Sequence, residues 1–143
     1  MPTFRDSDEM YKVHSALLDN LAAHPDIGPK LAESKLIIRF EVSDPEGVIT
    51  VNCRDEPSEE GRYVSYILGA CDLEPDITFV NSSDFSHEFW QGKINVMAAL
   101  MSGKTKAKGS IPNALKLLPI IKPAFKLYPE ILKEIGREDL IIK

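Results

Sequence analysis

The stretch that decides the fold is residues 76–118, which reads DITFVNSSDFSHEFWQGKINVMAALMSGKTKAKGSIPNALKLL. Its pattern predicts, in order, a short strand of β-branched and aromatic residues, two short helices, a lysine-rich strand and a Leu/Ile-rich helix. This order places more apolar surface around one small sheet than catalytic chemistry needs. The stretch therefore favours a domain that binds an apolar ligand.

Two short helices are expected after the strand at residues 76–80. Residues 81–84 offer several side chains that can cap the first helix, and Gly92 suits its end. The second helix is expected at residues 95–102. Together these helices contribute large, soft apolar side chains, which are Phe85, Phe89, Trp90, Met97 and Met101.

A strand with two unlike faces is expected at residues 104–110. Lysines at alternate positions would form one charged face, and Thr105, Ala107 and Gly109 would form a face without bulk. Small inward residues leave space that a Val or Leu would fill. Space beside aromatic and Met side chains predicts a cavity.

Upstream, the sequence predicts one amphipathic helix and three strands. The helix is capped by Ser7 or Asp8 and ends before Pro25, because the apolar residues between them follow helical spacing. The turn sequence DPEG joins the first two strands as an antiparallel hairpin. The expected strands are residues 35–42, 48–54 and 63–68, and a polar connector at 55–61 precedes the third.

The C-terminal part is apolar yet interrupted by prolines at 112, 119, 123 and 129, which one straight helix cannot contain. Short kinked helices are expected, either as a lid over a ligand or as a simple closure of the core. The predicted domain spans residues 1–143, with leading helices at 1–34, a sheet with inserted helices at 35–110 and the lid at 111–143. Its outward side chains would be Lys116, Lys122, Lys126 and Lys133.

Composition limits the classes of partner. The chain has 143 residues, 43% of them apolar, which suits one domain without a membrane span, and nothing at its start reads as a secretory signal. The cytoplasm is the expected compartment. Residues 1–103 carry 8 basic and 18 acidic side chains, whereas residues 104–143 carry 9 and 4. The acidic total argues against nucleic acid, and the basic C-terminal segment would suit transient contact with an anionic membrane surface or remain a solvated face.

Catalytic and metal-binding patterns are weak. SGKT at residues 102–105 has the ending of a phosphate-binding loop, but the glycine that such a loop needs is replaced by Ala98, and the order is helix to strand. His14, His24 and His87 are scattered without metal-ligand spacing. No cofactor, metal or catalytic residue is predicted. One enzymatic hypothesis is left open, in which His87 and Glu88 act as acid and base on an apolar substrate.

The segment GKTKAKG at residues 103–109 carries a resemblance to a known family. Together with DITF at 76–79, the capped aromatic helix, Gly92 and ALKL at 114–117, it resembles the sterol carrier protein type-2 domain. The resemblance is specific over residues 76–118 and loosely covers nearly the whole chain. It implies an α+β (α/β) fold, a five-stranded mixed sheet with helices packed on one face, enclosing an apolar tunnel without catalytic residues.

The resemblance implies that an apolar ligand is bound and transferred: a fatty acid, fatty acyl-CoA, phospholipid or sterol-like lipid. The alternative is an accessory subunit or interaction module that presents a lipid-like substrate to a partner enzyme. The sequence also leaves a homodimer open. The residues predicted to form the wall and lid are Phe40, Val51, Phe79, Phe85, Phe89, Trp90, Met97, Met101, Leu115, Leu118, Ile121 and Phe125.

Overall fold

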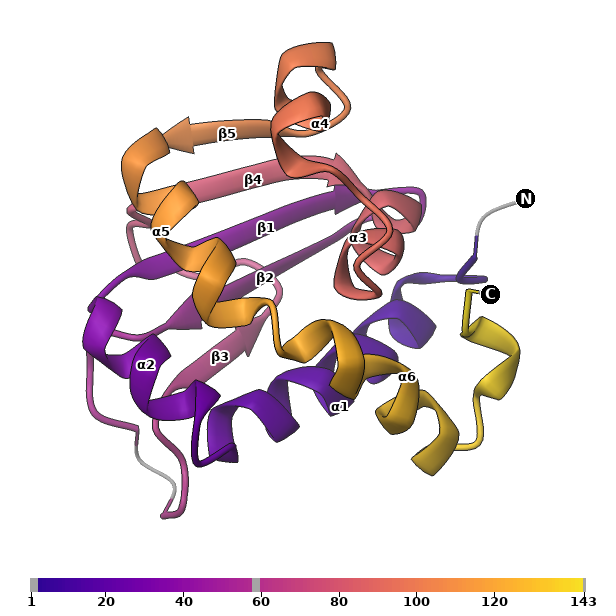
Figure 1. The fold of residues 1–143 in the computed structure, drawn as a ribbon, viewed down its shortest axis with the longest axis horizontal. Helices are drawn as coiled ribbons and strands as arrows, with labels where there is room; N and C mark the ends of the chain where they lie inside the picture. Colours follow the sequence, from indigo (N-terminus) through magenta and orange to yellow (C-terminus); the bar gives the residue numbers. More distant parts are fainter. Residues whose placement is uncertain (1–2, 58–59, 143) are drawn as a thin grey trace.

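The computed structural model describes residues 3–57 and 60–142, so residues 58 and 59 of the predicted connector lie outside the described part. The chain forms a five-stranded sheet in the order β3-β2-β1-β4-β5 (Figure 1). β1 runs parallel to β4, and the other neighbouring pairs are antiparallel, so the predicted mixed sheet is confirmed. The strands are β1 (Ile37–Ser43), β2 (Gly47–Asn52), β3 (Ser65–Leu68), β4 (Ile77–Ser82) and β5 (Lys106–Gly109).

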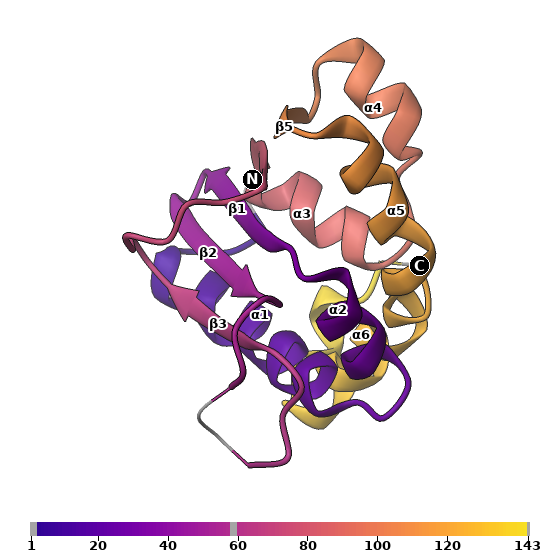
Figure 2. The ribbon, with the colours of Figure 1, turned by 90° about the vertical axis from the view of Figure 1, so that its left-hand side faces the viewer.

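The helices gather on one face of this sheet, and α4 lies at its β5 edge (Figure 2). They are α1 (Ser7–Ala23), α2 (Ile27–Ser34), α3 (Ser83–Trp90), α4 (Val96–Ser102), α5 (Ile111–Ile121), α6 (Ala124–Glu134) and the 3-10 turn η1 (Glu138–Leu140). The α+β fold with helices on one face is therefore as predicted.

The first helix buries the apolar stripe that its spacing predicts, but its cap is one residue earlier than expected. The Asp6 side chain accepts a hydrogen bond from the Glu9 N–H, whereas Ser7 is already helical and donates to the Glu46 carbonyl. α2 was not located from the sequence, because Gly28 and Pro29 disfavour a helix interior. Gly28 lets the Tyr63 ring lie directly on the backbone of α2.

The sheet turns its bulky apolar side chains toward the helices. Phe40 of β1 pairs with Phe79 of β4, which in turn pairs with Ala107 of β5. Because side chains alternate along a strand, Lys106 and Lys108 lie on the opposite face, where they are exposed. The predicted strand with one lysine face and one face of small residues is present, but it is shorter than the expected residues 104–110 and spans only Lys106–Gly109.

The C-terminal region forms two helices rather than one, as its prolines predict. The break falls at Lys122 and Pro123, between α5 and α6. α6 closes the core, since its Tyr128 and Leu132 side chains are fully buried. The four predicted outward lysines of this region are exposed.

Candidate functional site

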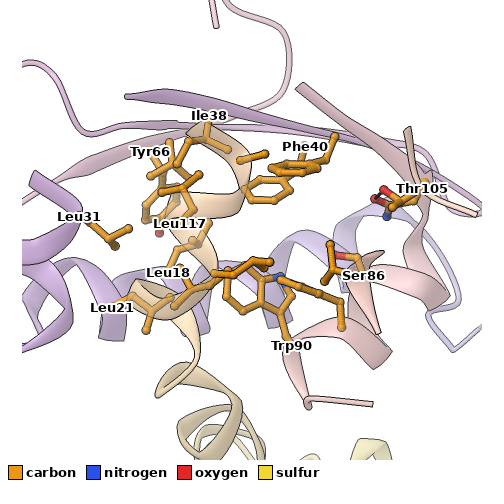
Figure 3. A pocket seen from close by; sticks show the side chains of 18 of the residues that line it. Leu18, Leu21, Leu31, Ile38, Phe40, Tyr66, Ser86, Trp90, Thr105 and Leu117 are labelled. Carbon is orange, nitrogen blue, oxygen red and sulfur yellow. Dashed lines mark hydrogen bonds between the residues drawn. The ribbon is translucent and has the colours of Figure 1, made fainter. Parts of the chain in front are cut away.

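A cavity of about 70 Å³ lies between the sheet and the helices. The strands β1, β2 and β4 form its roof, and α1, α2, α3 and α5 form its walls (Figure 3). Inside it, the Phe40 and Phe79 rings stack with centroids 5.7 Å apart, and the Trp90 ring lies 6.2 Å from Phe40. These aromatic faces give the cavity a rigid apolar centre.

Most of the residues predicted for the wall line this cavity. The sheet and α3 contribute three side chains each, and α5 contributes three more. Lining alone does not establish contact with a ligand, so their role in binding stays a prediction. These residues are Phe40, Val51, Phe79, Phe85, Phe89, Trp90, Leu115, Leu118 and Ile121.

Three predicted wall residues lie outside the lining: Met97, Met101 and Phe125. α4 is rotated relative to the expectation, so that Val96 and Leu100 line the cavity while Met97 is 51% and Met101 87% exposed. The rotation follows from burial of Ala99, whose carbonyl accepts hydrogen bonds from the backbone N–H groups of residues 104 and 105. Phe125 instead packs edge-on against Phe89 and covers Gly92.

Sequence reasoning missed two groups of lining residues. The first comes from α1, α2 and β3, where Leu21 was read only as helix core and the helix of Leu31 was not located. The second is polar: Asn81, Ser86 and Thr105. Inward alternation along β4 could have placed Asn81, and it had been read as a helix cap instead.

None of the described residues that line the cavity carries a formal charge. The Tyr66 ring lines it, but the Tyr66 hydroxyl donates to Asp19 Oδ1 at 2.5 Å. Burial, together with this carboxylate, raises the pKa of Tyr66 to about 12. Tyr66 therefore stays neutral, and the cavity offers no charged group for an ionic ligand to pair with.

His87 belongs to a separate buried cluster between α3, α6 and η1. Its Nε2 lies 2.7 Å from the Leu140 carbonyl oxygen and its Nδ1 2.9 Å from the Tyr128 hydroxyl. Burial lowers the pKa of His87. Both ring nitrogens are engaged and the ring does not line the cavity, so the acid–base hypothesis for His87 and Glu88 finds no support in the geometry.

Within the described residues, no group of three or more His, Cys, Asp or Glu side chains is arranged to hold a metal ion. No helix in that same part of the chain has the length and apolarity needed to cross a membrane. The candidate site is therefore the uncharged cavity.

An α+β domain whose sheet and helices enclose an uncharged apolar cavity defines a class of small lipid-binding domains. The chain belongs to the SCP-2 sterol transfer family, whose sequence model matches residues 16–122. Membership implies lipid binding or transfer in general, and such domains are generally non-catalytic. The resemblance seen in residues 76–118 is thereby confirmed.

Solved structures agree with this assignment. The sterol carrier protein domain 2 of Helicoverpa armigera is 27% identical, with a TM-score of 0.59 over 80% of this chain and 89% of that one. Sterol carrier protein 2 from Yarrowia lipolytica in its apo form is 20% identical, with a TM-score of 0.59 over 87% and 94%. A UbiJ-SCP2 ubiquinone synthesis protein is 16% identical, with a TM-score of 0.57 over 80% and 89%. No curated protein sequence matches the chain.

Proposed function

We propose that the protein binds one lipid molecule in the cavity and transfers it without catalysing a reaction. The observation that carries the proposal is the cavity itself, which is apolar, uncharged and enclosed by aromatic and aliphatic side chains. Burial of hydrocarbon against such a lining is favourable, and the lining has no group that would activate a nucleophile.

The free energy available from burial is sufficient for specific binding. Each buried methylene contributes about 0.8 kcal/mol, so a chain of about a dozen carbons gains on the order of 10 kcal/mol. Lost translational and conformational freedom of the ligand offsets part of this gain. Micromolar affinity requires about 8 kcal/mol and is therefore within reach without an ion pair.

A lipid of that length requires the cavity to expand. Its volume of about 70 Å³ is roughly half that of an engineered cavity of ~150 Å³ that admits benzene. The part best able to move is the segment we call the α4–α5 corner, which comprises α4, β5 and α5. Within its two helices only Ala99, Ala114 and Leu117 are buried. We therefore assign the lid to α5 with α4, and α6 to the core.

We infer that the α4–α5 corner also contacts membranes transiently. This contact would be the step in which a lipid enters the cavity. Three apolar side chains of this corner are exposed, Met97, Met101 and Ile111, and Lys104 and Lys116 of the same part of the chain are exposed as well. Exposed apolar side chains can enter a bilayer and lysines attract anionic head groups, so the combination suits a membrane surface. The basic charge of residues 104–143 points in the same direction.

A second candidate function is presentation of the bound lipid to a partner enzyme or to a second copy of the chain. The exposed methionines favour it as well, because flexible thioether side chains adapt to protein surfaces. Copurification of a specific enzyme under native conditions would support this candidate. Capture by membrane vesicles without any protein partner would support the first.

The test begins with native mass spectrometry and organic extraction of the purified protein. A stoichiometric lipid supports carriage, and Leu118→Trp should then reduce its retention at least tenfold, because the indole fills the cavity. Met101→Trp is the matched control, since that side chain is 87% exposed and outside the lining. Equal lipid retention by both variants, or no binding of any lipid by the wild type, would contradict the proposal.

A further inference from the structure

The two ends of the cavity differ in chemistry. At one end lie Leu21, Leu31 and the Tyr66 ring, and at the other lie Ser86 and Thr105 (Figure 3). Asn81, which bonds to Thr105, lines the cavity at this second end. The cavity therefore has an apolar end under α1 and α2 and a polar end between α3, β4 and β5.

The side chains of the polar end are held in place yet keep free hydrogen-bonding capacity. The Thr105 hydroxyl donates to Asn81 Oδ1 at 3.1 Å, and Asn81 Nδ2 donates to the Ser82 carbonyl at 2.8 Å. An amide nitrogen carries two N–H groups and a hydroxyl oxygen two lone pairs. Within residues 3–57 and 60–142, one N–H of Asn81 and the lone pairs of the Thr105 oxygen therefore have no hydrogen-bond partner, and Thr105 is almost fully buried.

No positive charge reaches this end from the neighbouring strand. Lys106 and Lys108 of β5 pair with Val80 and Thr78, on the face of the sheet opposite to the cavity. Ser86 faces His14 Nε2 at 3.4 Å, and burial keeps that histidine neutral by lowering its pKa to about 4. An ionised head group placed here would lose its hydration without gaining a counter-ion.

We propose that the ligand is a lipid with one uncharged oxygen function, such as an alcohol or a carbonyl, seated head-first on Asn81 and Thr105. A hydroxyl or carbonyl oxygen accepts the free N–H of Asn81, and a hydroxyl also donates to Thr105. The hydrocarbon tail extends past Phe40 and Trp90 toward Leu31. This inference rests on the proposed function and adds ligand class and orientation to it.

The test compares dodecanol with dodecanoic acid, two ligands of equal chain length. Trp90 is the only tryptophan of the chain and lines the cavity, so its fluorescence reports occupancy directly. The affinity for dodecanol should stay constant between pH 6 and pH 8. The affinity for dodecanoic acid should fall about tenfold per pH unit, because only the protonated acid fits a site without a counter-ion.

Dodecanol binding by two Thr→Val variants tests where the head group lies. Thr105→Val keeps the shape of the side chain, removes its hydroxyl and should weaken dodecanol binding about fivefold, the effect of one neutral hydrogen bond. Thr78→Val is the matched control, since Thr78 is also buried but lies on the opposite face of the sheet. Urea unfolding of both variants verifies that each is folded.

The outcomes separate this inference from the proposed function. Failure of the wild type to bind either ligand, together with no lipid retained in native mass spectrometry, would overturn carriage itself. Binding of dodecanoic acid with equal affinity at pH 6 and pH 8 would show that the carboxylate reaches solvent or a cation, and would overturn the head-first orientation while leaving carriage intact. An unchanged dodecanol affinity in Thr105→Val, with folding retained, would do the same.

Discussion

The α4–α5 corner and the opposite half of the molecule, where α1, α6 and η1 pack together, are built in contrasting ways. In the α1–α6 half, Leu17, Tyr128 and Leu132 are fully buried and the polar atoms of His87 are engaged. In the corner, α4 buries only Ala99 and leaves Met101 exposed. The contrast indicates that stability comes from the first half and room for a ligand from the second.

The largest expected effect tests the stability of the α1–α6 half. Leu132→Ala should lower the free energy of unfolding by about 3 kcal/mol, because it leaves a void among fully buried side chains. Leu115→Ala is its matched control in the corner, where the side chain is 38% exposed, and should cost below about 1 kcal/mol. Urea unfolding measures both changes in the free energy of unfolding. Comparable losses in the two variants would contradict the difference in stability between the two regions.

A second prediction concerns the close approach of β5 to the backbone at the start of β4. Gly109 of β5 has φ +102°, and a Cβ there would collide with the backbone carbonyl of Asp76. Gly109→Ala should cost about 2 to 3 kcal/mol, since neither backbone can yield cheaply. Gly103 also has positive φ but faces open space, so Gly103→Ala should cost about 1 kcal/mol. A higher melting temperature for Gly109→Ala than for Gly103→Ala in thermal unfolding would contradict this prediction.

A third prediction follows from His14 in the α1–α6 half. Burial lowers the pKa of His14 from 6.5 to about 4, so between these values the unfolded chain binds a proton that the folded chain does not. Stability therefore falls as pH falls through this window, by about 2 kcal/mol from pH 7 to pH 5. Burial shifts His87 in the same direction. Urea unfolding at both pH values checks this, and His14→Gln should flatten the dependence.

The smallest expected effect on stability comes from a substitution in the α4–α5 corner. Met101→Gln should change the free energy of unfolding by less than about 0.5 kcal/mol, because the side chain is 87% exposed. The same substitution should slow lipid transfer from anionic vesicles, measured by stopped-flow fluorescence, while equilibrium affinity stays unchanged. A loss of affinity instead would place Met101 inside the binding site.

Local pattern was enough to predict the individual strands and most of the helices, whereas their assembly into one mixed five-stranded sheet was predicted from the family resemblance. The alternation around Phe40 and Phe79 placed both rings on the cavity face, and the small residues of β5 predicted space beside them. More than one helix was predicted within residues 1–34, but the bounds of α2 were not, because Gly28 and Pro29 are poor helix formers. Tertiary packing with Tyr63 overrides that preference.

The site was harder to predict than the fold, because lining depends on the rotation of each element. Along α4, Met97 and Val96 are separated by about 100° of helical turn, and only the tertiary contacts of Ala99 decide which of them faces inward. Asn81 and Thr105 could not be paired from sequence, since they meet only when β4 and β5 lie side by side.

The parallel pairing of β1 with β4 has a consequence for the order of folding. The β1–β2 hairpin closes through a short turn, whereas β4 reaches β1 only after the intervening chain has been brought into place. Contacts between distant parts of a chain form slowly, because loop closure costs entropy before those contacts stabilise the product. The Phe40–Phe79 stack that roofs the cavity belongs to that slow step. We therefore expect the β1–β2 hairpin to form before the β1–β4 pairing that closes the interior.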